Sequence, residues 1–412
     1  MPEVITPMSD TAQDHPTAPG AARPLSLRIG SAAAWVFCVV VIVCGAVFFA
    51  PKLPIRPIQD VLGLGGLLLS TMTVWFAVAF FLGAMIAVIA WQGRSWWRLA
   101  AAVVAAVLAL LVVLVPWLAA ERTAAASGDS VSWLSFSDDG SRLSPTQTTT
   151  FATVEGRALR LDVYRPVPAS AAAPAIVYVH GGGFNQGDRG DSRRWFSWLA
   201  TQGVTVFSID YRLAPPARWQ QAAGDVKCAL GWVRGHAGEY GVAPENVSVA
   251  GDSAGANLAL MAAYTVGDPQ FPPSCPVPEA PVRSVISLYA PTDLPAALDD
   301  TKMPDAARHL LNDYIGGGLD RHRDRYVAAS PIAHVTPGLP ATLLVQGGSD
   351  HLVPPDQSDS LTVELTNAAD PVQTLDLPWV DHGFLSEWGS WGSQLLRPQL
   401  TRFLRQHLLS ES

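Results

Sequence analysis

Residues 251–255 have the sequence GDSAG and match the pattern G-x-S-x-G. The apolar run NVSVA precedes the pattern and predicts a strand, whereas residues 254–264 have the composition of a helix. A sharp turn from strand to helix lifts a serine hydroxyl clear of a sheet, and glycines fit the crowded flanks of that turn. The motif also occurs by chance, so its context carries the argument: it predicts that Ser253 is a nucleophile.

A serine hydroxyl becomes a nucleophile when an imidazole accepts its proton and a carboxylate orients that imidazole. With this kind of turn, the acid and then the histidine follow the serine along the chain. Asp350 and His382 each follow a predicted strand, so we assign them as the acid and the base. Asp381 is a rival for the acid. We favour Asp350, because Asp381 adjoins His382 in sequence and is poorly placed to face its ring.

A glycine turn, HGGG at residues 180–183, closes a further predicted strand. Acyl transfer places negative charge on the carbonyl oxygen of the substrate, and backbone N–H groups commonly stabilise that charge. Glycines allow the ligand to approach the backbone closely. We therefore expect Gly181 and Gly182, together with the N–H of Ala254, to form an oxyanion hole.

The composition divides the chain into two parts. Of 412 residues, 49% are hydrophobic and 15% charged, against about 25% charged in a soluble domain. Residues 1–120 hold only 6 of the 27 Lys and Arg residues and 4 of the 35 acidic residues. The net charge of −8 argues against a nucleic-acid partner. Four cysteines exclude a disulfide-dense scaffold.

The first part predicts a membrane anchor. Three runs without charge, 32–50, 61–93 and 99–120, follow one another, and about 20 apolar residues cross a bilayer. We expect three transmembrane helices within residues 31–120, the second at 67–91, and membrane lipids as their neighbours. A disordered tail is expected at residues 1–30.

The second part predicts an α/β domain. After an expected linker at 121–145, residues 146–412 alternate between short apolar runs and helical patterns, which indicates a mostly parallel sheet covered on both faces. The expected strands are 159–164, 175–179, 204–209, 246–250, 282–289, 341–345 and 372–377.

Five motifs in this order resemble the alpha/beta-hydrolase esterases and lipases: HGGG, DYRLAP at 210–215, GDSAG, GGSDHLVP at 347–354 and DHGF at 381–384. The hormone-sensitive-lipase-like and carboxylesterase branch is the most similar. The resemblance implies the alpha/beta-hydrolase fold with an eight-stranded sheet. It also implies hydrolysis of carboxylic esters through an acyl-enzyme, on the triad named above. The branch's usual acid motif, D-P-L-x-D-E, is replaced here.

The resemblance also suggests roles for two further segments. Residues 293–326 are expected to be cap-like and to line the acyl pocket. Asp210 and Arg212 are expected to pair with each other beneath the glycine turn.

Two other classes of function stay open: a thioesterase or peptidase on the same triad, and a non-catalytic membrane protein that binds a lipid or a partner. The expected substrate is a small ester or a lipid. No metal-binding motif is present, so we expect neither metal nor cofactor. The oligomeric state is not indicated.

The cysteines bear on the compartment. Cys228 is expected in the helix before the nucleophile strand and Cys275 in a Pro-rich loop after the nucleophile helix. Such neighbouring elements allow a disulfide, which persists in an oxidising compartment; two unrelated thiols are the alternative. The Lys and Arg residues that flank the predicted spans weakly favour the same orientation under the positive-inside rule. We therefore expect a multi-pass protein of the cell membrane whose hydrolase domain is extracytoplasmic.

Overall fold

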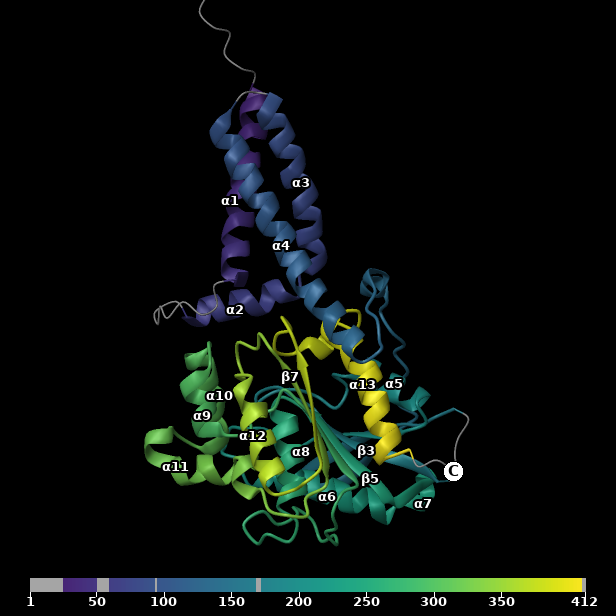
Figure 1. The fold of residues 1–412 in the computed structure, drawn as a ribbon. Helices are drawn as coiled ribbons and strands as arrows, with labels where there is room; N and C mark the ends of the chain where they lie inside the picture. The colour runs from purple at the N-terminus through teal and green to yellow at the C-terminus, as the bar shows by residue number, and fades with distance from the viewer. Residues whose placement is uncertain (1–24, 50–58, 93–94, 168–171, 410–412) are drawn as a thin grey trace, which may run out of the picture.

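The computed structural model describes residues 25–49, 59–92, 95–167 and 172–409. A bundle of helices stands on an α/β domain (Figure 1). The bundle comprises α1 (Leu25–Phe49), α2 (Gln59–Ser70), α3 (Thr73–Gln92) and α4 (Trp96–Ala126). Within the described part of the chain, three of these helices (α1, α3 and α4) are long and apolar enough to cross a membrane.

The boundaries of these helices differ from the expected ones. The helix α1 begins at Leu25, inside the predicted tail, of which residues 1–24 lie outside the described residues. The second apolar run forms two helices, with α3 beginning at Thr73 rather than at residue 67. The hydroxyls of Ser70 and Thr71 donate to carbonyls of the last turn of α2, at 2.7 and 2.8 Å. Such bonds compete with a continuing helix, so α2 ends there.

The helix α4 joins the two parts of the molecule without a loose linker. Its 31 residues make it about 46 Å long. Ala120 and Ala124, near its end, are buried in the core of the α/β domain. The short 3-10 helix Trp133–Ser137 follows, and the Trp133 ring packs against that of Trp391. The segment expected as a linker, 121–145, thus begins inside α4 and continues along the surface of the domain.

The α/β domain contains an eight-stranded sheet in the order β1-β2-β4-β3-β5-β6-β7-β8. The strand β2 is antiparallel to both of its neighbours, β1 and β4, and the other neighbouring strands are parallel. The strands are β1 (Gln147–Val154), β2 (Arg157–Tyr164), β3 (Ala173–Val179), β4 (Thr205–Ile209), β5 (Val242–Asp252), β6 (Ser284–Leu288), β7 (Ala341–Gly347) and β8 (Val372–Leu377). The expected fold class and the eight-stranded sheet are confirmed. Sequence patterning missed β1 because most residues of this edge strand are polar and only one of them is buried.

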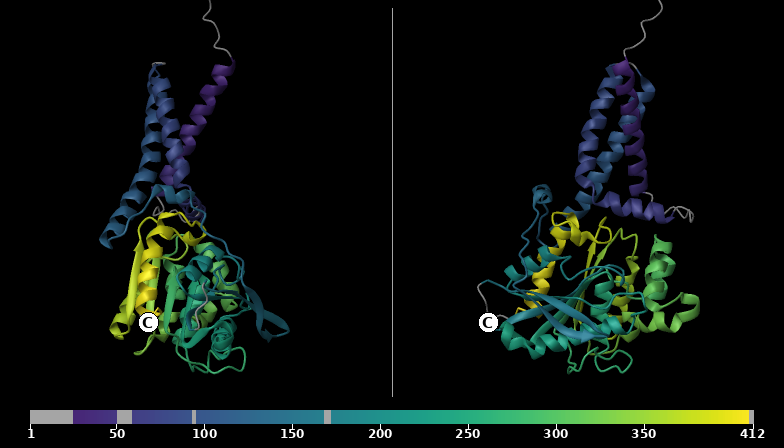
Figure 2. Two further views of the ribbon diagram at one scale, coloured as in Figure 1. Left: turned by 90° about the vertical axis from the view of Figure 1, so that its right-hand side faces the viewer. Right: turned by 180° about the vertical axis from the view of Figure 1, so that it is seen from behind.

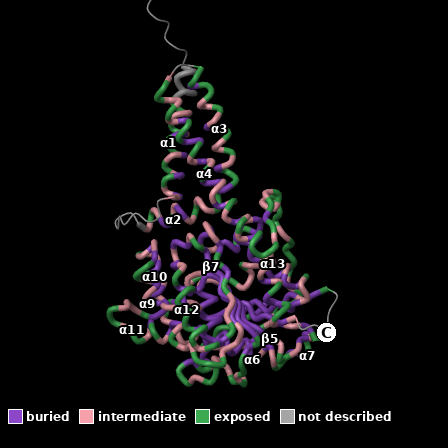
Figure 3. Tube along the Cα trace, viewed as in Figure 1, coloured by how far each residue is buried: buried purple, intermediate pink, exposed green. Residues whose placement is uncertain are grey.

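Helices cover both faces of the sheet (Figure 2). One face packs on α6 (Gln221–Gly235), α8 (Ala254–Tyr264) and α12 (Asp356–Asn367). The other face packs on α5 (Arg193–Thr201), α13 (Trp391–His407) and the end of α4. The remaining helices are α7 (Ala237–Tyr240), α9 (Leu294–Asp300), α10 (Pro304–Ile315) and α11 (Leu319–Ala328). The strands between these layers are the most buried part of the molecule (Figure 3), and their carboxyl ends carry the loops described next.

Candidate active site

Ser253 occupies the turn between β5 and α8. Its backbone has φ 51° and ψ −121°, a conformation that costs free energy in a non-glycine residue and persists only where neighbours hold it. The N–H of Ser253 donates to the carbonyl of Leu288 at 2.8 Å. A Cβ atom at Gly255 would lie 2.1 Å from the carbonyl oxygen of Val179. The glycine therefore allows α8 to pass close to β3, and the serine is held at the carboxyl edge of the sheet.

The structure brings Ser253, His382 and Asp350 together from three separate loops. The hydroxyl of Ser253 lies 2.9 Å from Nε2 of His382, and Nδ1 of His382 lies 2.7 Å from a carboxylate oxygen of Asp350. The N–H groups of Leu352 and Val353 donate to the other oxygen of that carboxylate, at 3.0 and 2.8 Å. The acid is thus fixed by its own loop while it faces the imidazole.

The electrostatics of the pair favour a basic imidazole. Burial lowers the pKa of His382, but the carboxylates of Asp350, Asp381 and Asp252 outweigh this effect, so its pKa lies above the ordinary value of 6.5. Burial raises the pKa of the Asp350 carboxyl, and the adjacent His382 opposes that rise. The imidazole is therefore placed and tuned to accept a proton from the serine.

The glycine turn needs a correction to its expected role. The N–H of Gly181 donates to the carboxylate of Asp252 at 3.1 Å, so it is not directed at a substrate. Within the described residues, no protein acceptor takes the N–H of Gly182, Gly183 or Ala254. Gly183 and Ala254 line the pocket beside Ser253. These three amides, rather than Gly181, are available to an oxyanion.

Asp252 is a functional residue that the sequence reasoning missed. Its carboxylate accepts hydrogen bonds from the Tyr178 hydroxyl at 2.8 Å and from the Gly181 amide, so it ties the glycine turn to the nucleophile turn. Burial raises its pKa, against the hydrogen bond from Tyr178. Its position could have identified it from the sequence, because Asp252 directly precedes the candidate nucleophile in GDSAG.

The expected pairing of Asp210 with Arg212 is wrong. Arg212 instead forms a buried bidentate pair with Asp225, with its closest contact at 2.7 Å. Asp210 pairs with Arg189 at 3.0 Å. Each charge is satisfied by a neighbour that is distant in sequence, and sequence adjacency did not identify either partner.

A second Asp–His pair lies beside the first. Nδ1 of His351 is 2.5 Å from a carboxylate oxygen of Asp381. The other oxygen of Asp381 accepts the backbone N–H groups of His351 and His382, at 3.0 and 2.7 Å. Asp381, the rival acid, thus faces the ring of His351 and not that of His382. Its carboxylate also ties together the loops that carry Asp350 and His382.

A small apolar pocket opens beside the nucleophile, with a cavity volume of about 40 Å³. Much of its lining comes from the segment expected to be cap-like, through Ala297 on α9 and Ala307, Leu310 and Leu311 on α10. Leu352 and Val353, which follow the acid, complete one wall. The volume holds roughly three or four heavy atoms.

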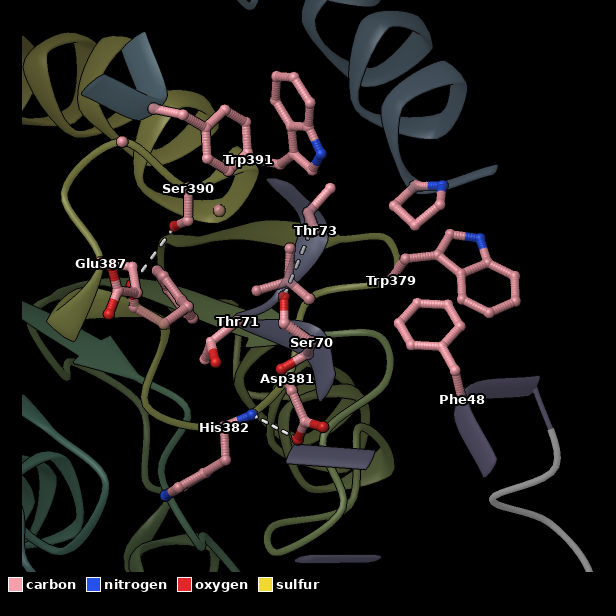
Figure 4. Close-up of a pocket in the computed structure, with 16 residues that line it drawn as sticks. Phe48, Ser70, Thr71, Thr73, Trp379, Asp381, His382, Glu387, Ser390 and Trp391 are labelled. Atoms are coloured by element: carbon pink, nitrogen blue, oxygen red, sulfur yellow. Dashed lines mark hydrogen bonds between the residues drawn. The ribbon is translucent and has the colours of Figure 1, made fainter. Parts of the chain in front are cut away.

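A second pocket lies between the bundle and the loop that carries His382, with a cavity volume of about 70 Å³ (Figure 4). Thr71 and Phe48 line it from the bundle, and Trp379 and Asp381 line it from the α/β domain. The indole of Trp379 stacks on Phe48 with ring centroids 5.9 Å apart. The bundle therefore packs directly on the loop of the candidate base.

Cys228 on α6 and Cys275 in the Pro-rich loop after α8 are joined by a disulfide, with Cα atoms 5.4 Å apart. The other two cysteines, Cys38 and Cys44, are free and lie on α1. The bond pins the loop 265–281 to the helix beneath the sheet.

Known proteins share this domain. The family model described as BD-FAE matches residues 161–365. Two esterases of Mycobacterium tuberculosis are similar: the probable carboxylic ester hydrolase LipM is 31% identical over 233 residues, 56% of this chain and 54% of LipM. Esterase LipC is 34% identical over 232 residues, 54% of this chain and 56% of LipC. The chain spans about half the length of these curated relatives.

A solved structure agrees in fold. Esterase Est2 of Thermogutta terrifontis superposes with a TM-score of 0.52 at 23% identity, covering 63% of this chain and 91% of Est2. The chain thus has the alpha/beta-hydrolase fold, and its sequence is similar to esterases of the hormone-sensitive-lipase-like branch. The expected resemblance is confirmed.

Proposed function

We propose that this chain is a membrane-anchored serine esterase that hydrolyses carboxylic esters of short acyl groups. One observation carries the proposal: the continuous hydrogen-bonded series from Ser253 through His382 to Asp350, at 2.9 and 2.7 Å, at the mouth of an apolar pocket. The relatives named above are esterases by name, which supports the reaction class.

The proposed reaction has two halves. Ser253 attacks the ester carbonyl while His382 takes the hydroxyl proton, and the tetrahedral oxyanion lies against the amides of Gly182, Gly183 and Ala254. His382 then gives its proton to the departing alcohol, which leaves an acyl-serine. Water attacks the acyl-serine by the reverse route, with His382 as base, and releases the acid. Asp350 stabilises the imidazolium in both halves.

The size of the pocket supports a short acyl group, since about 40 Å³ leaves room for an acetyl to butyryl chain. Est2 was solved with propionate and with butyrate bound. An acetyl esterase of Salmonella enteritidis is 41% identical over 107 residues, 26% of this chain and 32% of that enzyme. These likenesses agree with the pocket but cover only the catalytic domain.

The test is a panel of p-nitrophenyl esters from two to twelve carbons, assayed with the full chain in detergent or nanodiscs. We expect the specificity constant to be highest at two to four carbons and to fall with longer chains. A fluorophosphonate probe should label the wild type and not Ser253→Ala. A maximum at eight carbons or more would contradict the short-acyl proposal. Absence of labelling and of turnover would contradict the esterase.

The proposed location is the cell membrane, with the hydrolase domain outside the cytoplasm. Two observations support this location: three helices are long and apolar enough to cross a bilayer, and the disulfide between Cys228 and Cys275 favours an oxidising compartment. Protease added to intact cells or spheroplasts should remove the domain, and peptide mapping without reductant should find the linked pair. A protected domain with two alkylatable thiols would contradict the location.

A further inference from the structure

The helix α2 is separate from the spans and lies across the base of the bundle, between the bundle and the α/β domain (Figures 1 and 2). Its 12 residues extend about 18 Å, too short for a bilayer core of about 30 Å. It connects the end of α1 at Phe49 with the start of α3 at Thr73. Because both of those helices are candidate spans, α2 lies at the level where they leave the bilayer.

The two sides of α2 differ in chemistry. Val61, Leu64 and Leu68 are exposed, at 70%, 48% and 53%, and their spacing places them on one face of the helix. Gly63 and Gly66 lie on the opposite face and are buried. A short helix with one apolar face, placed at the end of two spans, has the properties of an interfacial helix, whose apolar face enters the headgroup region by about 5–10 Å.

The glycine side of α2 is fitted to the α/β domain. A Cβ atom at Gly63 would lie 2.6 Å from the side chain of Met303, and one at Gly66 would lie 2.7 Å from the ring of His351. The carboxylate of Asp60 accepts the N–H groups of Asp305 and Ala306, at 3.1 and 3.2 Å, at the start of α10. The helix therefore contacts both the cap-like segment, residues 293–326, and the loop that follows the candidate acid.

The elements under α2 are those that form the acyl pocket. Its contacts fall on α10, which supplies Ala307, Leu310 and Leu311 to the pocket, and on His351, next to Leu352. Ser253 lines the same pocket and thus lies on the edge of the domain that faces α2, which is itself about 10 Å thick. An ester bond within the acyl region of the bilayer lies too deep to reach it, whereas an ester on a lipid headgroup extends toward it.

We infer that the substrate is a bilayer-resident amphiphile that carries a short acyl ester on its polar headgroup. The inference rests on the proposed esterase function and specifies its substrate class. The small apolar pocket receives the acyl group, and the headgroup remains at the level of α2. Hydrolysis then releases a short carboxylic acid into water and leaves the deacylated amphiphile in the membrane.

The test uses the full chain in lipid nanodiscs with three acetyl esters. One is an O-acetylated octadecyl glucoside, the second is the O-acetylated methyl glucoside, which stays in water, and the third is a phospholipid with its acetyl ester on the glycerol backbone. We expect the octadecyl glucoside ester to be hydrolysed at least about tenfold faster than either of the others. The membrane raises its concentration near the enzyme, and its acetyl ester lies on the headgroup, which extends toward Ser253. p-Nitrophenyl acetate measures the esterase itself.

Two variants separate the contribution of α2. The double variant Leu64→Asn with Leu68→Asn should hydrolyse the octadecyl glucoside ester about fivefold more slowly or slower still, since α2 loses the apolar face that enters the membrane interface. It should hydrolyse p-nitrophenyl acetate at the wild-type rate, and that rate also shows that the variant is folded. Val363→Asn is the matched control, because Val363 is similarly exposed, at 55%, but lies on α12.

The outcomes are distinct. Equal rates on the two glucosides, or a faster phospholipid ester, with active p-nitrophenyl acetate turnover, would overturn the inference and leave the esterase standing. An unchanged preference in the double variant would overturn the role of α2. No turnover of p-nitrophenyl acetate by the wild type would contradict the esterase proposal instead.

Discussion

Two buried Asp–His pairs lie side by side at the carboxyl ends of β7 and β8. The α/β domain holds two Asp-His dipeptides, 350–351 and 381–382, and in the structure each aspartate faces the histidine of the other dipeptide. The two pairs have nearly the same chemistry and burial. They differ in what the far nitrogen of each ring meets: Nε2 of His382 lies 2.9 Å from the Ser253 hydroxyl, whereas Nε2 of His351 is buried against α2 with no polar partner among the described residues.

The comparison shows that an Asp–His pair does not by itself make a catalytic site. An orienting carboxylate is useful only where the other ring nitrogen reaches a nucleophile. The pair of His351 and Asp381 holds the two loops together, because the Asp381 carboxylate accepts both backbone amides. We therefore expect substitutions in one pair to change chemistry and substitutions in the other to change mainly position and electrostatics.

The largest effect should come from the nucleophile that distinguishes the pairs. Ser253→Ala should lower kcat by about 10⁶-fold, since the acyl-enzyme route is lost. Ester hydrolysis by the purified full chain measures this effect, and circular dichroism checks that the fold is kept. Hydrolysis near the wild-type rate would remove Ser253 from the proposed triad.

The two acids should differ sharply. Asp350→Asn should lower kcat/KM by about 10⁴-fold, because an amide at this place favours the wrong imidazole tautomer. Asp381→Asn keeps an oxygen that can accept hydrogen bonds from the two backbone amides, so kcat/KM should fall only on the order of tenfold. The two variants form a matched pair for parallel assays of kcat/KM. The reverse ranking would make Asp381 the acid of the triad.

Acidification should abolish activity, because only neutral His382 can accept the serine proton. The carboxylates around His382 raise its pKa above the ordinary value of 6.5. The midpoint of the loss of activity on acidification should therefore lie above pH 6.5. Asp381→Asn removes one of those negative charges and should move the midpoint of kcat/KM to lower pH. A midpoint that stays in place would show that Asp381 has no electrostatic effect on the catalytic pair.

The smallest effect on rate should come from the disulfide, which lies in elements that carry neither pair. Its sequence separation is 47 residues, and closing a loop of that length stabilises a fold by about 4 kcal/mol in the chain-entropy estimate. The double variant Cys228→Ser with Cys275→Ser should lower the temperature of thermal inactivation while kcat/KM at 25 °C changes by less than about twofold.

Cys44→Ser, at a free cysteine of α1, serves as the control for the loss of a thiol and should leave the inactivation temperature unchanged. A marked loss of kcat/KM in the disulfide variant at 25 °C would show that the bond shapes the site as well as the stability.

Much of the site could be predicted because its parts are local. A strand that ends in a glycine turn, or in G-x-S-x-G, is recognisable from a few neighbouring residues, and these segments were placed correctly on β3, β5 and α8. The edge strand β1 was missed because it lacks an apolar pattern, and the second apolar run was read as one helix because hydropathy does not register the side-chain bonds of Ser70 and Thr71.

Long-range pairing was decided only by the tertiary structure. The sequence determined the fold class, the three apolar helices and the order of the motifs, since these depend on residue type and periodicity. It could not determine that the Gly181 amide turns to Asp252, that Arg212 pairs with Asp225, or that α2 packs on His351. Those contacts join residues that are far apart in the chain, and packing sets their distances and directions.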